Sequence, residues 1–245
     1  TAADQFNWTY DTTGPTMTIT AAEGIDGFKS GDATLSLTFT SNEATTNFEI
    51  GDISVSNGTL SSFVAVSNTV YTATLTPIAA GEVTIDVAAA TFTDATSNNN
   101  TAAVQFNWFY DNTGPTMAIT AAEGADGFSS NDATLSLTFT SNEATTNFEI
   151  GDISVSNGTL SSFVAVSNTV YTAILTPIAD GEVTIDVLAT TFTDASSNNN
   201  TASDQFNWFY DVSPPIIVFS PINGAIEVAL KEKITLTFNE PIRNI

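Results

Sequence analysis

Residues 33–40 read ATLSLTFT, and residues 133–140 read ATLSLTFT again. In each segment an apolar residue alternates with a hydroxyl residue, so Leu35, Leu37 and Phe39 would share one face of an extended chain. Long helical periodicity is missing from the sequence, and Thr, Val, Ile and Phe dominate its patterned segments. The segment therefore predicts a β-strand with one buried face.

The chain repeats itself with a period of 100 residues. Residues 1–100 and 101–200 align without a gap and differ at 12 positions, and a third copy begins at Thr201 with TASDQFNWFYD before it departs from the pattern. A fixed repeat of this length indicates a modular array. Identical tandem copies are typical of spacers, stalks and fibres, and catalytic sites are rarely built that way.

Each repeat contains about seven short segments of strand character and a closing strand. The pair Asn57-Gly58 predicts a hairpin between residues 53–56 and 59–66, because both turn residues tolerate positive φ. The tryptophan of each closing strand, at Trp8, Trp108 and Trp208, is expected in the core. The predicted strands of the first repeat are 16–21, 33–40, 47–50, 53–56, 59–66, 69–76 and 82–92, with the closing strand at 101–110.

Short strands at this spacing predict an all-β fold of tandem immunoglobulin-like antiparallel β-sandwiches. Each repeat begins beside a Gly-Pro pair, as at Gly14-Pro15, and proline marks a stiff start to a domain. Because the linkers are short, we expect the domains to be arranged as a rod. The predicted division is 1–11, the closing strand of a preceding repeat; 12–111 and 112–211, two Ig-like repeats; and 212–245, the start of a truncated, divergent Ig-like domain. We interpret the chain as part of a longer protein.

Composition excludes several classes of function. The chain has 27 acidic and 4 basic residues, a formal net charge of −23, so it has no basic patch for nucleic acid or anionic membrane. It contains no Cys and no His, which excludes disulfides, the usual zinc sites and histidine-based catalysis. We find no catalytic carboxylate pair, nucleophile elbow or phosphate loop, and no long apolar run that would insert into a membrane. The chain is therefore not expected to be an enzyme.

The order of its motifs resembles a known family. FNWxYDxTGP, ATLSLTFTSNEATTNFEIGDISVSNGTLSSF, VYTATLTP, GEVTIDV and FTDATSNN resemble the bacterial immunoglobulin-like tandem repeat domains of large surface adhesins, over residues 1–210. The resemblance implies secreted domains, stiffened by calcium, that hold a ligand-binding region away from the cell. This chain differs at one turn, where Asp94-Ala95-Thr96-Ser97-Asn98 replaces the family's Asp-x-x-Gly-Asn.

Acidic residues recur in three loops that meet at one pole of such a sandwich. These are the segment before the first strand, the loop after the second strand and the loop before the last strand. Oxygen ligands from separate loops are what Ca²⁺ requires. We therefore hypothesise calcium at Asp11, Glu43 and Asp94, at Asp111, Glu143 and Asp194, and at Asp211 and Glu240. The acids at the opposite pole, such as Glu23 and Asp26, are weaker candidates.

The sequence therefore predicts a non-catalytic spacer or stalk of a large secreted or cell-surface, adhesin-like protein, rigidified by calcium at its domain junctions. Its partners would be neighbouring domains of the same long chain. Two alternatives stay open. The chain could be a subunit of an extracellular filament, sheath or virion fibre, assembled with other copies by strand complementation. It could also be an Ig-like module that binds a cell-surface glycan or protein.

Overall fold

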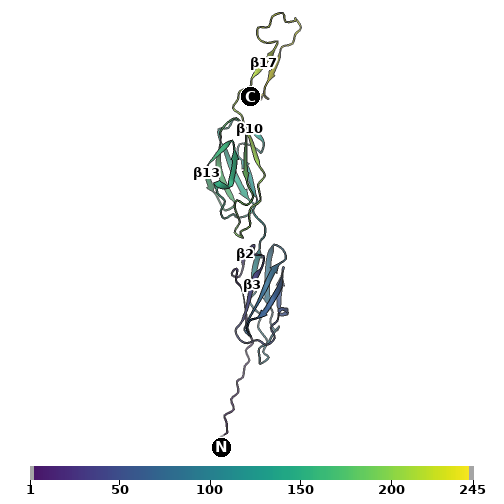
Figure 1. Ribbon diagram of the computed structural model, residues 1–245, viewed down its shortest axis with the longest axis vertical. Coiled ribbons are helices and arrows are strands. Elements are labelled where there is room, and N and C mark those ends of the chain that lie inside the picture. Colours follow the sequence, from purple (N-terminus) through teal and green to yellow (C-terminus); the bar gives the residue numbers. More distant parts are fainter. Residues whose placement is uncertain (1–2, 243–245) are drawn as a thin grey trace. The chain divides into compact units, whose positions relative to one another are not determined.

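The computed structural model describes residues 3–242, which form β-strands and two short 3-10 helices (Figure 1). The first repeat contains η1 (Ile50–Asp52) and the strands β1 (Met17–Ala21), β2 (Phe28–Ser30), β3 (Leu35–Ser41), β4 (Ile53–Ser56), β5 (Gly58–Ala65), β6 (Val70–Pro77), β7 (Gly81–Val87) and β8 (Phe106–Tyr110).

The second repeat has the same elements at the same spacing. It contains η2 (Ile150–Asp152) and the strands β9 (Met117–Ala121), β10 (Phe128–Ser130), β11 (Leu135–Ser141), β12 (Ile153–Ser156), β13 (Gly158–Ala165), β14 (Val170–Pro177), β15 (Gly181–Val187) and β16 (Phe206–Tyr210). A final antiparallel pair, β17 (Ile217–Ser220) with β18 (Thr235–Phe238), lies in the predicted divergent segment.

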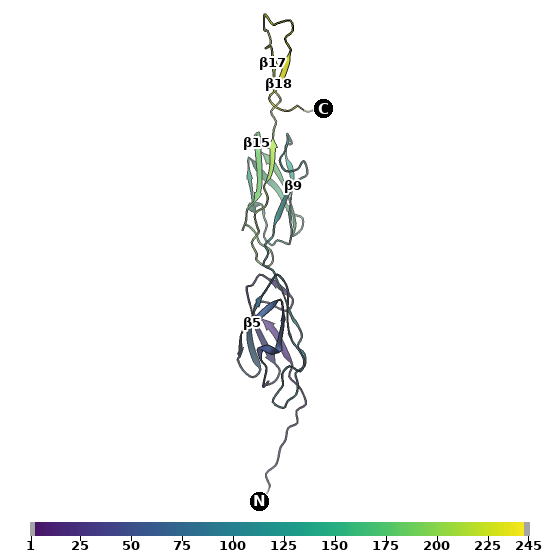
Figure 2. The ribbon, with the colours of Figure 1, turned by 90° about the vertical axis from the view of Figure 1, so that its right-hand side faces the viewer.

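Each repeat is a sandwich of two four-stranded sheets, as predicted. In the first repeat the strand orders are β1-β3-β6-β5 and β2-β8-β7-β4, and the second repeat follows the same order. In Figure 2, β9 and β15, which belong to different sheets, lie on opposite sides of the second repeat. β2 pairs in parallel with β8, and β10 pairs in parallel with β16, whereas the other pairs of the first repeat are antiparallel. The all-β, tandem Ig-like fold class is thus confirmed.

The chain divides into two compact units. Unit 1 contains residues 1–116, 141–148 and 189–201, and unit 2 contains residues 117–140, 149–188 and 202–245. Two loops of the second repeat thus belong to unit 1, and they carry Glu143 and Asp194.

The predicted alternation of apolar and hydroxyl residues identifies the core residues of β3 correctly. Leu35, Leu37 and Phe39 are buried in β3, and Trp108 of β8 is fully buried. The ring of Phe28 stacks on Trp108 with centroids 6.1 Å apart, and the indole Nε1 donates a hydrogen bond to Ser30 Oγ at 3.0 Å. The short strand β2, which the sequence pattern did not predict, therefore covers the tryptophan and satisfies its polar atom.

Three strand predictions for the first repeat were wrong in detail. Residues 47–50 form no strand, because the chain there enters η1, where Asp52 accepts a hydrogen bond from Glu49 N at 2.8 Å. The predicted strand at 82–92 ends at Val87, and the closing strand begins only at Phe106. Between them, Asn100 is buried and its amide binds the backbone of the loop, which replaces ladder hydrogen bonds.

The predicted hairpin at Asn57-Gly58 was also wrong. β4 pairs with β7 in one sheet and β5 pairs with β6 in the other, so the turn carries the chain from sheet to sheet. Asn57 does adopt a positive φ of 52°. Its side chain is bound to the backbone of Ala79 and Glu82, contacts that fix the crossing and that a two-residue hairpin would not need.

The segment before the first repeat differs from the strands that it matches in sequence. Residues 6–10 read FNWTY, whereas β8 reads FNWFY. Phe6, Trp8 and Tyr10 are 90%, 75% and 73% exposed, whereas Phe106 and Trp108 are buried. The expectation of a core position therefore holds for Trp108 and Trp208. Residues 6–10 pair with none of the described strands, and the expectation that they close a preceding repeat, with Trp8 in its core, stays a prediction.

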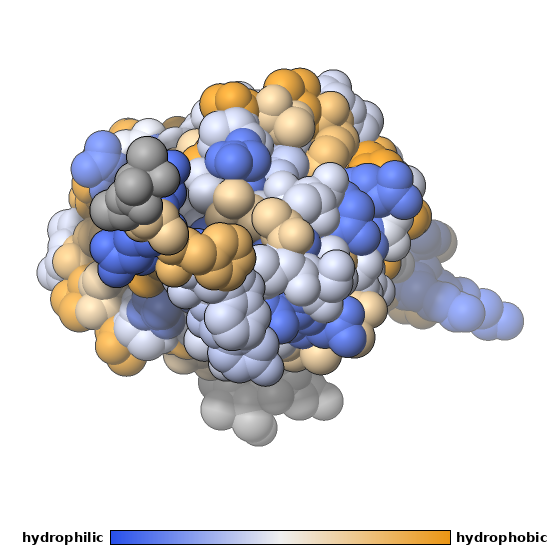
Figure 3. All heavy atoms as spheres, turned by 90° about the horizontal axis from the view of Figure 1, so that it is seen from below, coloured by the Kyte–Doolittle hydropathy of each residue, from blue (hydrophilic) through white to orange (hydrophobic). Residues whose placement is uncertain are grey.

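Exposed apolar residues also occur elsewhere on the described surface, including Val66 and Ile78. Figure 3 shows apolar and hydrophilic residues interspersed over the face that it draws. Within the described residues, none of the helices has the length and apolar character needed to cross a bilayer.

Replacing Gly14 by alanine tests how tightly the leading segment packs. A Cβ atom at Gly14 would lie 1.9 Å from the backbone oxygen of Asn99, so one of the two segments must move. We expect Gly14→Ala to lower the free energy of unfolding of the first repeat by about 1–3 kcal/mol, measured by calorimetry on the full chain. The control Gly51→Ala, whose Cβ would lie 3.8 Å from Glu49 Oε1, should stay within about 0.5 kcal/mol. Equal effects would contradict tight packing at Gly14.

Candidate metal site

Two groups of three carboxylates come together in the described part of the chain. Asp11, in the segment before β1, lies beside Glu43, which follows β3, and Asp94, which follows β7; each offers an oxygen within 4.8 Å of the others. The second group is Asp111, Glu143 and Asp194, with the same spacing. The structure thus brings together both sets that the sequence singled out, and both lie within unit 1.

The loop at Asp94 is built around its carboxylate. Asp94 Oδ1 accepts hydrogen bonds from the backbone N–H groups of Thr96 and Asn98, both at 2.8 Å, and Oδ2 accepts from the side chains of the same two residues. Burial alone would raise the pKa of Asp94, but the hydrogen bonds from Asn98 and Thr96 outweigh it and hold the pKa below its ordinary value. Asp94 is therefore ionised and fixed in place.

The same loop explains how the chain tolerates its departure from the family turn. Ser97 occupies the position of the family's glycine and adopts a φ of 67°, and Ser197 adopts 66°. The left-handed backbone geometry is thus kept without glycine. Asn98 then donates from Nδ2 to the backbone oxygens of Asp11 and Thr13, at 3.3 and 3.2 Å, which ties the loop to the leading segment.

Glu43 carries negative charge that the described residues do not neutralise. Its Oε1 atom is buried and has no hydrogen-bond partner among them. Burial, followed by the charges of Asp11 and Asp94, raises the pKa of Glu43 above its ordinary value. A hard cation would remove this repulsion, and three carboxylates from separate segments are a suitable donor set for Ca²⁺. The residues present therefore fit a calcium ion.

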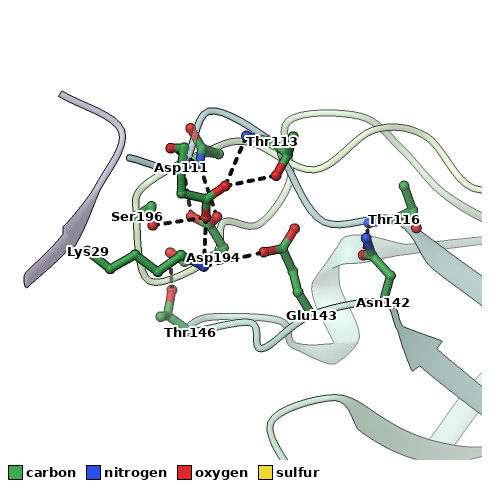
Figure 4. A network of polar contacts seen from close by, with 10 residues as sticks. Lys29, Asp111, Thr113, Thr116, Asn142, Glu143, Thr146, Asp194 and Ser196 are labelled. Atoms are coloured by element: carbon green, nitrogen blue, oxygen red, sulfur yellow. Dashed lines mark hydrogen bonds and ion pairs between the residues drawn. The ribbon is translucent and has the colours of Figure 1, made fainter. Parts of the chain in front are cut away.

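The second group contains a positive charge of its own (Figure 4). Lys29 Nζ lies 2.8 Å from Asp111 Oδ2 and 4.0 Å from Glu143 Oε2. Ser196 Oγ donates to the same Asp111 oxygen at 3.1 Å, and Asn198 Nδ2 donates to the Asp111 backbone oxygen at 2.9 Å. Asp111 is thereby surrounded by donors.

These contacts shift the pKa values of Asp111, Lys29 and Glu143 in different directions. Burial would raise the pKa of Asp111, but hydrogen bonds from Lys29, Thr113 and Ser196 hold it well below its ordinary value. The hydrogen bond to Asp111 raises the pKa of Lys29 against the opposing effect of burial. Burial and the neighbouring Asp111 and Asp194 raise the pKa of Glu143, although Lys29 acts in the opposite direction. The result is a fixed ammonium–carboxylate pair beside a less readily ionised glutamate.

The third predicted set is a pair. Asp211 and Glu240 line one pocket of unit 2, together with Ser129, Ser130 and Asn131. Glu240 Oε1 is buried and has no hydrogen-bond partner among the described residues. Burial and then Asp211 raise the pKa of Glu240 above its ordinary value.

The acids at the opposite pole have structural roles. Glu23 accepts hydrogen bonds from the backbone N–H of Ser36 at 2.9 and 3.0 Å, and Asp26 accepts from the backbone N–H of Asn107 at 2.7 Å. Their oxygens already have backbone donors, and these acids are absent from the carboxylate groups found among the described residues. They are therefore poorer candidates than the acids at the leading pole.

Sequence reasoning missed Lys29 as a member of the second group. The sequence did single out this lysine, because position 29 is one of the 12 at which the repeats differ, and the second repeat has Ser129 there. The lysine was not assigned because the strand that carries it, β2, is only three residues long and was not predicted.

Comparison with known proteins identifies the family. The family described as "Bacterial Ig-like domain" matches residues 11–109 and 111–210, so this chain belongs to the bacterial Ig-like domain family. None of the curated proteins matches the chain.

Solved structures resemble the chain at low identity. InvD of Yersinia pseudotuberculosis is 18% identical over 86% of this chain and 64% of that one, with a TM-score of 0.37. Invasin, described as a bacterial integrin-binding protein, is 16% identical over 83% and 41%, with a TM-score of 0.40. The adhesin InvE of Yersinia pseudotuberculosis is 15% identical over 81% and 59%, with a TM-score of 0.28. The chain spans less than two thirds of the length of each.

The variant Asp94→Asn tests the loop at the first group. It should lower the midpoint temperature of the first repeat by several degrees in EDTA at pH 7, because a carboxylate with four hydrogen bonds becomes an amide. The folded-state pKa of Asp94 is depressed, so its contribution is complete above its ordinary pKa and is lost as pH falls through the folded-state value. The difference from wild type should therefore shrink below about pH 4. Glu82→Gln, at an exposed acid, serves as the control for charge.

The variant Ser97→Gly tests the strain in the turn. Glycine adopts positive φ without a steric penalty but loses more entropy on folding. We expect a net gain of about 0.5 kcal/mol or somewhat more in the unfolding free energy of the first repeat, measured by denaturant titration. A loss of stability would show that the serine is not strained there.

Proposed function

We propose that this chain is a non-catalytic structural spacer of an adhesin-like protein at a bacterial cell surface. The supporting observation is that two nearly identical Ig-like domains follow each other, each with its own buried core and with a carboxylate group at the same place in the fold. Repetition of one domain extends a chain without adding a new recognition surface. A glycan- or protein-binding role would instead need loops that differ between the repeats, and most of their loops are identical.

Calcium is the second part of the proposal. Asp11, Glu43 and Asp94 would hold the ion, which would supply the positive charge that Glu43 lacks. The ion would connect the segment before β1 to two loops of the sandwich, in addition to the hydrogen bonds that Asn98 donates to that segment. Such a connection would stiffen the chain where one domain passes into the next.

A calcium titration tests this part. Calcium at about 100 times its Kd should raise the unfolding free energy of the first repeat by about 2.7 kcal/mol, and EDTA should reverse the gain. Glu43→Gln should weaken binding measured by calorimetry, because it removes one anionic ligand, while Glu82→Gln should leave binding unchanged. Hydrogen exchange at residues 11–15 should slow in calcium. Equal binding by the two variants would contradict the assignment of Glu43.

Strand donation is a second candidate, supported by the exposed aromatic residues of the leading segment. Residues 6–10 match β8 at all but one position, and β8 lies between β2 and β7. A copy of this segment could therefore take the place of β8 in another chain and bury Phe6 and Trp8 there.

Sedimentation over a range of concentrations separates the two candidates. A spacer should stay monomeric, because each described repeat already contains its own closing strand. Strand donation predicts association that Trp8→Ser abolishes and that Ile78→Ser, at another exposed apolar residue, leaves unchanged. Association that survives Trp8→Ser would contradict strand donation through this segment.

A further inference from the structure

Differences between the two repeats gather around Asp111. Lys29, Gly31 and Ser196 all differ from their counterparts, Ser129, Asn131 and Thr96. Lys29 and Ser196 contact the Asp111 carboxylate directly. A Cβ atom at Gly31 would lie 3.0 Å from the Asp111 backbone oxygen and 2.9 Å from Asn198 Oδ1. Three of the 12 differences therefore lie around Asp111.

The fold places Lys29 beside Asp111. β2 pairs in parallel with β8 so that Lys29 is opposite Phe109 and Ser30 is opposite Tyr110, and the backbone N–H of Asp111 donates to Ser30 O at 3.0 Å. The ammonium also lies 6.0 Å from the centre of the Phe109 ring. The Lys29 side chain is 45% exposed, but its partner Asp111 is only 6% exposed, so the paired oxygen is shielded from water.

We propose that Lys29 is a built-in counter-ion that occupies the cation position of the Asp111, Glu143 and Asp194 group, so that this group is stable without calcium. The inference rests on the proposed binding of calcium by Asp11, Glu43 and Asp94. A Ca²⁺ ion bound to Asp111 Oδ2 would lie about 2.3–2.6 Å from it, and Lys29 Nζ is already 2.8 Å from the same oxygen. Two cations bound to the same oxygen repel each other, so they compete for the group.

The group at Asp211 and Glu240 lacks this ammonium. The position equivalent to Lys29 beside Asp211 and Glu240 is Ser129, whose hydroxyl donates to the backbone oxygen of Phe209. There Glu240 Oε1 has no hydrogen-bond partner in the described chain, as is true of Glu43 Oε1 in the first group. Glu143 has Lys29 within 4.0 Å. The second and third groups thus differ, because the second is supplied with its own cation and the third depends on an external one.

Calcium calorimetry on the full chain tests the inference. The variant Lys29→Ser copies the residue of the second repeat, and it should bind one more calcium ion than wild type; adding Glu143→Gln should remove the extra site. Lys231→Ser deletes the charge of another exposed lysine and should leave the stoichiometry unchanged. If wild type already loses as much calcium on Glu143→Gln as on Glu43→Gln, Lys29 does not occupy the group. An unchanged stoichiometry in Lys29→Ser would overturn the inference equally.

A double-mutant cycle in EDTA separates this inference from the calcium proposal. Lys29→Ser and Asp111→Asn should each lower the midpoint temperature, and the double variant should lose less than the sum of the two. The coupling should weaken in high salt, as expected for a partly exposed ion pair. If no variant binds calcium, the proposed calcium site fails, and this coupling alone decides whether Lys29 balances the group. Additive effects of the two substitutions would overturn the role of Lys29.

Discussion

The pairing of β8 with both β2 and β7 is the constraint on which the rest of the first repeat depends. It buries Trp108 between the sheets and supplies Ser30 as the partner of the indole nitrogen. Because β8 ends at Tyr110, the same pairing delivers Asp111 to the edge of the sheet, one residue beyond the aromatic strand. Core packing and the position of the Asp111 carboxylate are therefore fixed by one register.

The acidic groups show how a chain of high negative charge can hold carboxylates close together. Hydrogen bonds from the backbone and from Asn98 keep Asp94 ionised. Glu43 therefore lies close to the negative charges of Asp11 and Asp94. Such an arrangement is unfavourable unless a cation is present. The first group meets this requirement, as we propose, with an ion from solution, and the second with the side chain of Lys29. At the position of Lys29, the strand beside Asp211 and Glu240 carries Ser129 instead.

The sequence predicted much of this because alternation and repetition are local signals. The strand at residues 33–40, the two sandwiches and the meeting of Asp11, Glu43 and Asp94 all follow from pattern and topology. The hairpin at Asn57-Gly58 did not form, because which sheet a strand joins is decided by packing across the core and not by the turn itself. Lys29 was missed for a related reason: a strand of three residues is too short to show a period, and its parallel pairing with β8 links positions about 80 residues apart.

The two closing strands have the same sequence, FNWFY, in β8 and β16. Each strand could therefore take the place of the other between its neighbouring strands, so side-chain complementarity alone cannot select the native pairing. During synthesis β8 emerges 100 residues before β16, so the first sandwich can close before its competitor exists. Refolding of the complete chain from denaturant removes that order. The order of synthesis thus favours the native pairing in addition to the short connection between β7 and β8, which already makes that pairing less costly in loop entropy.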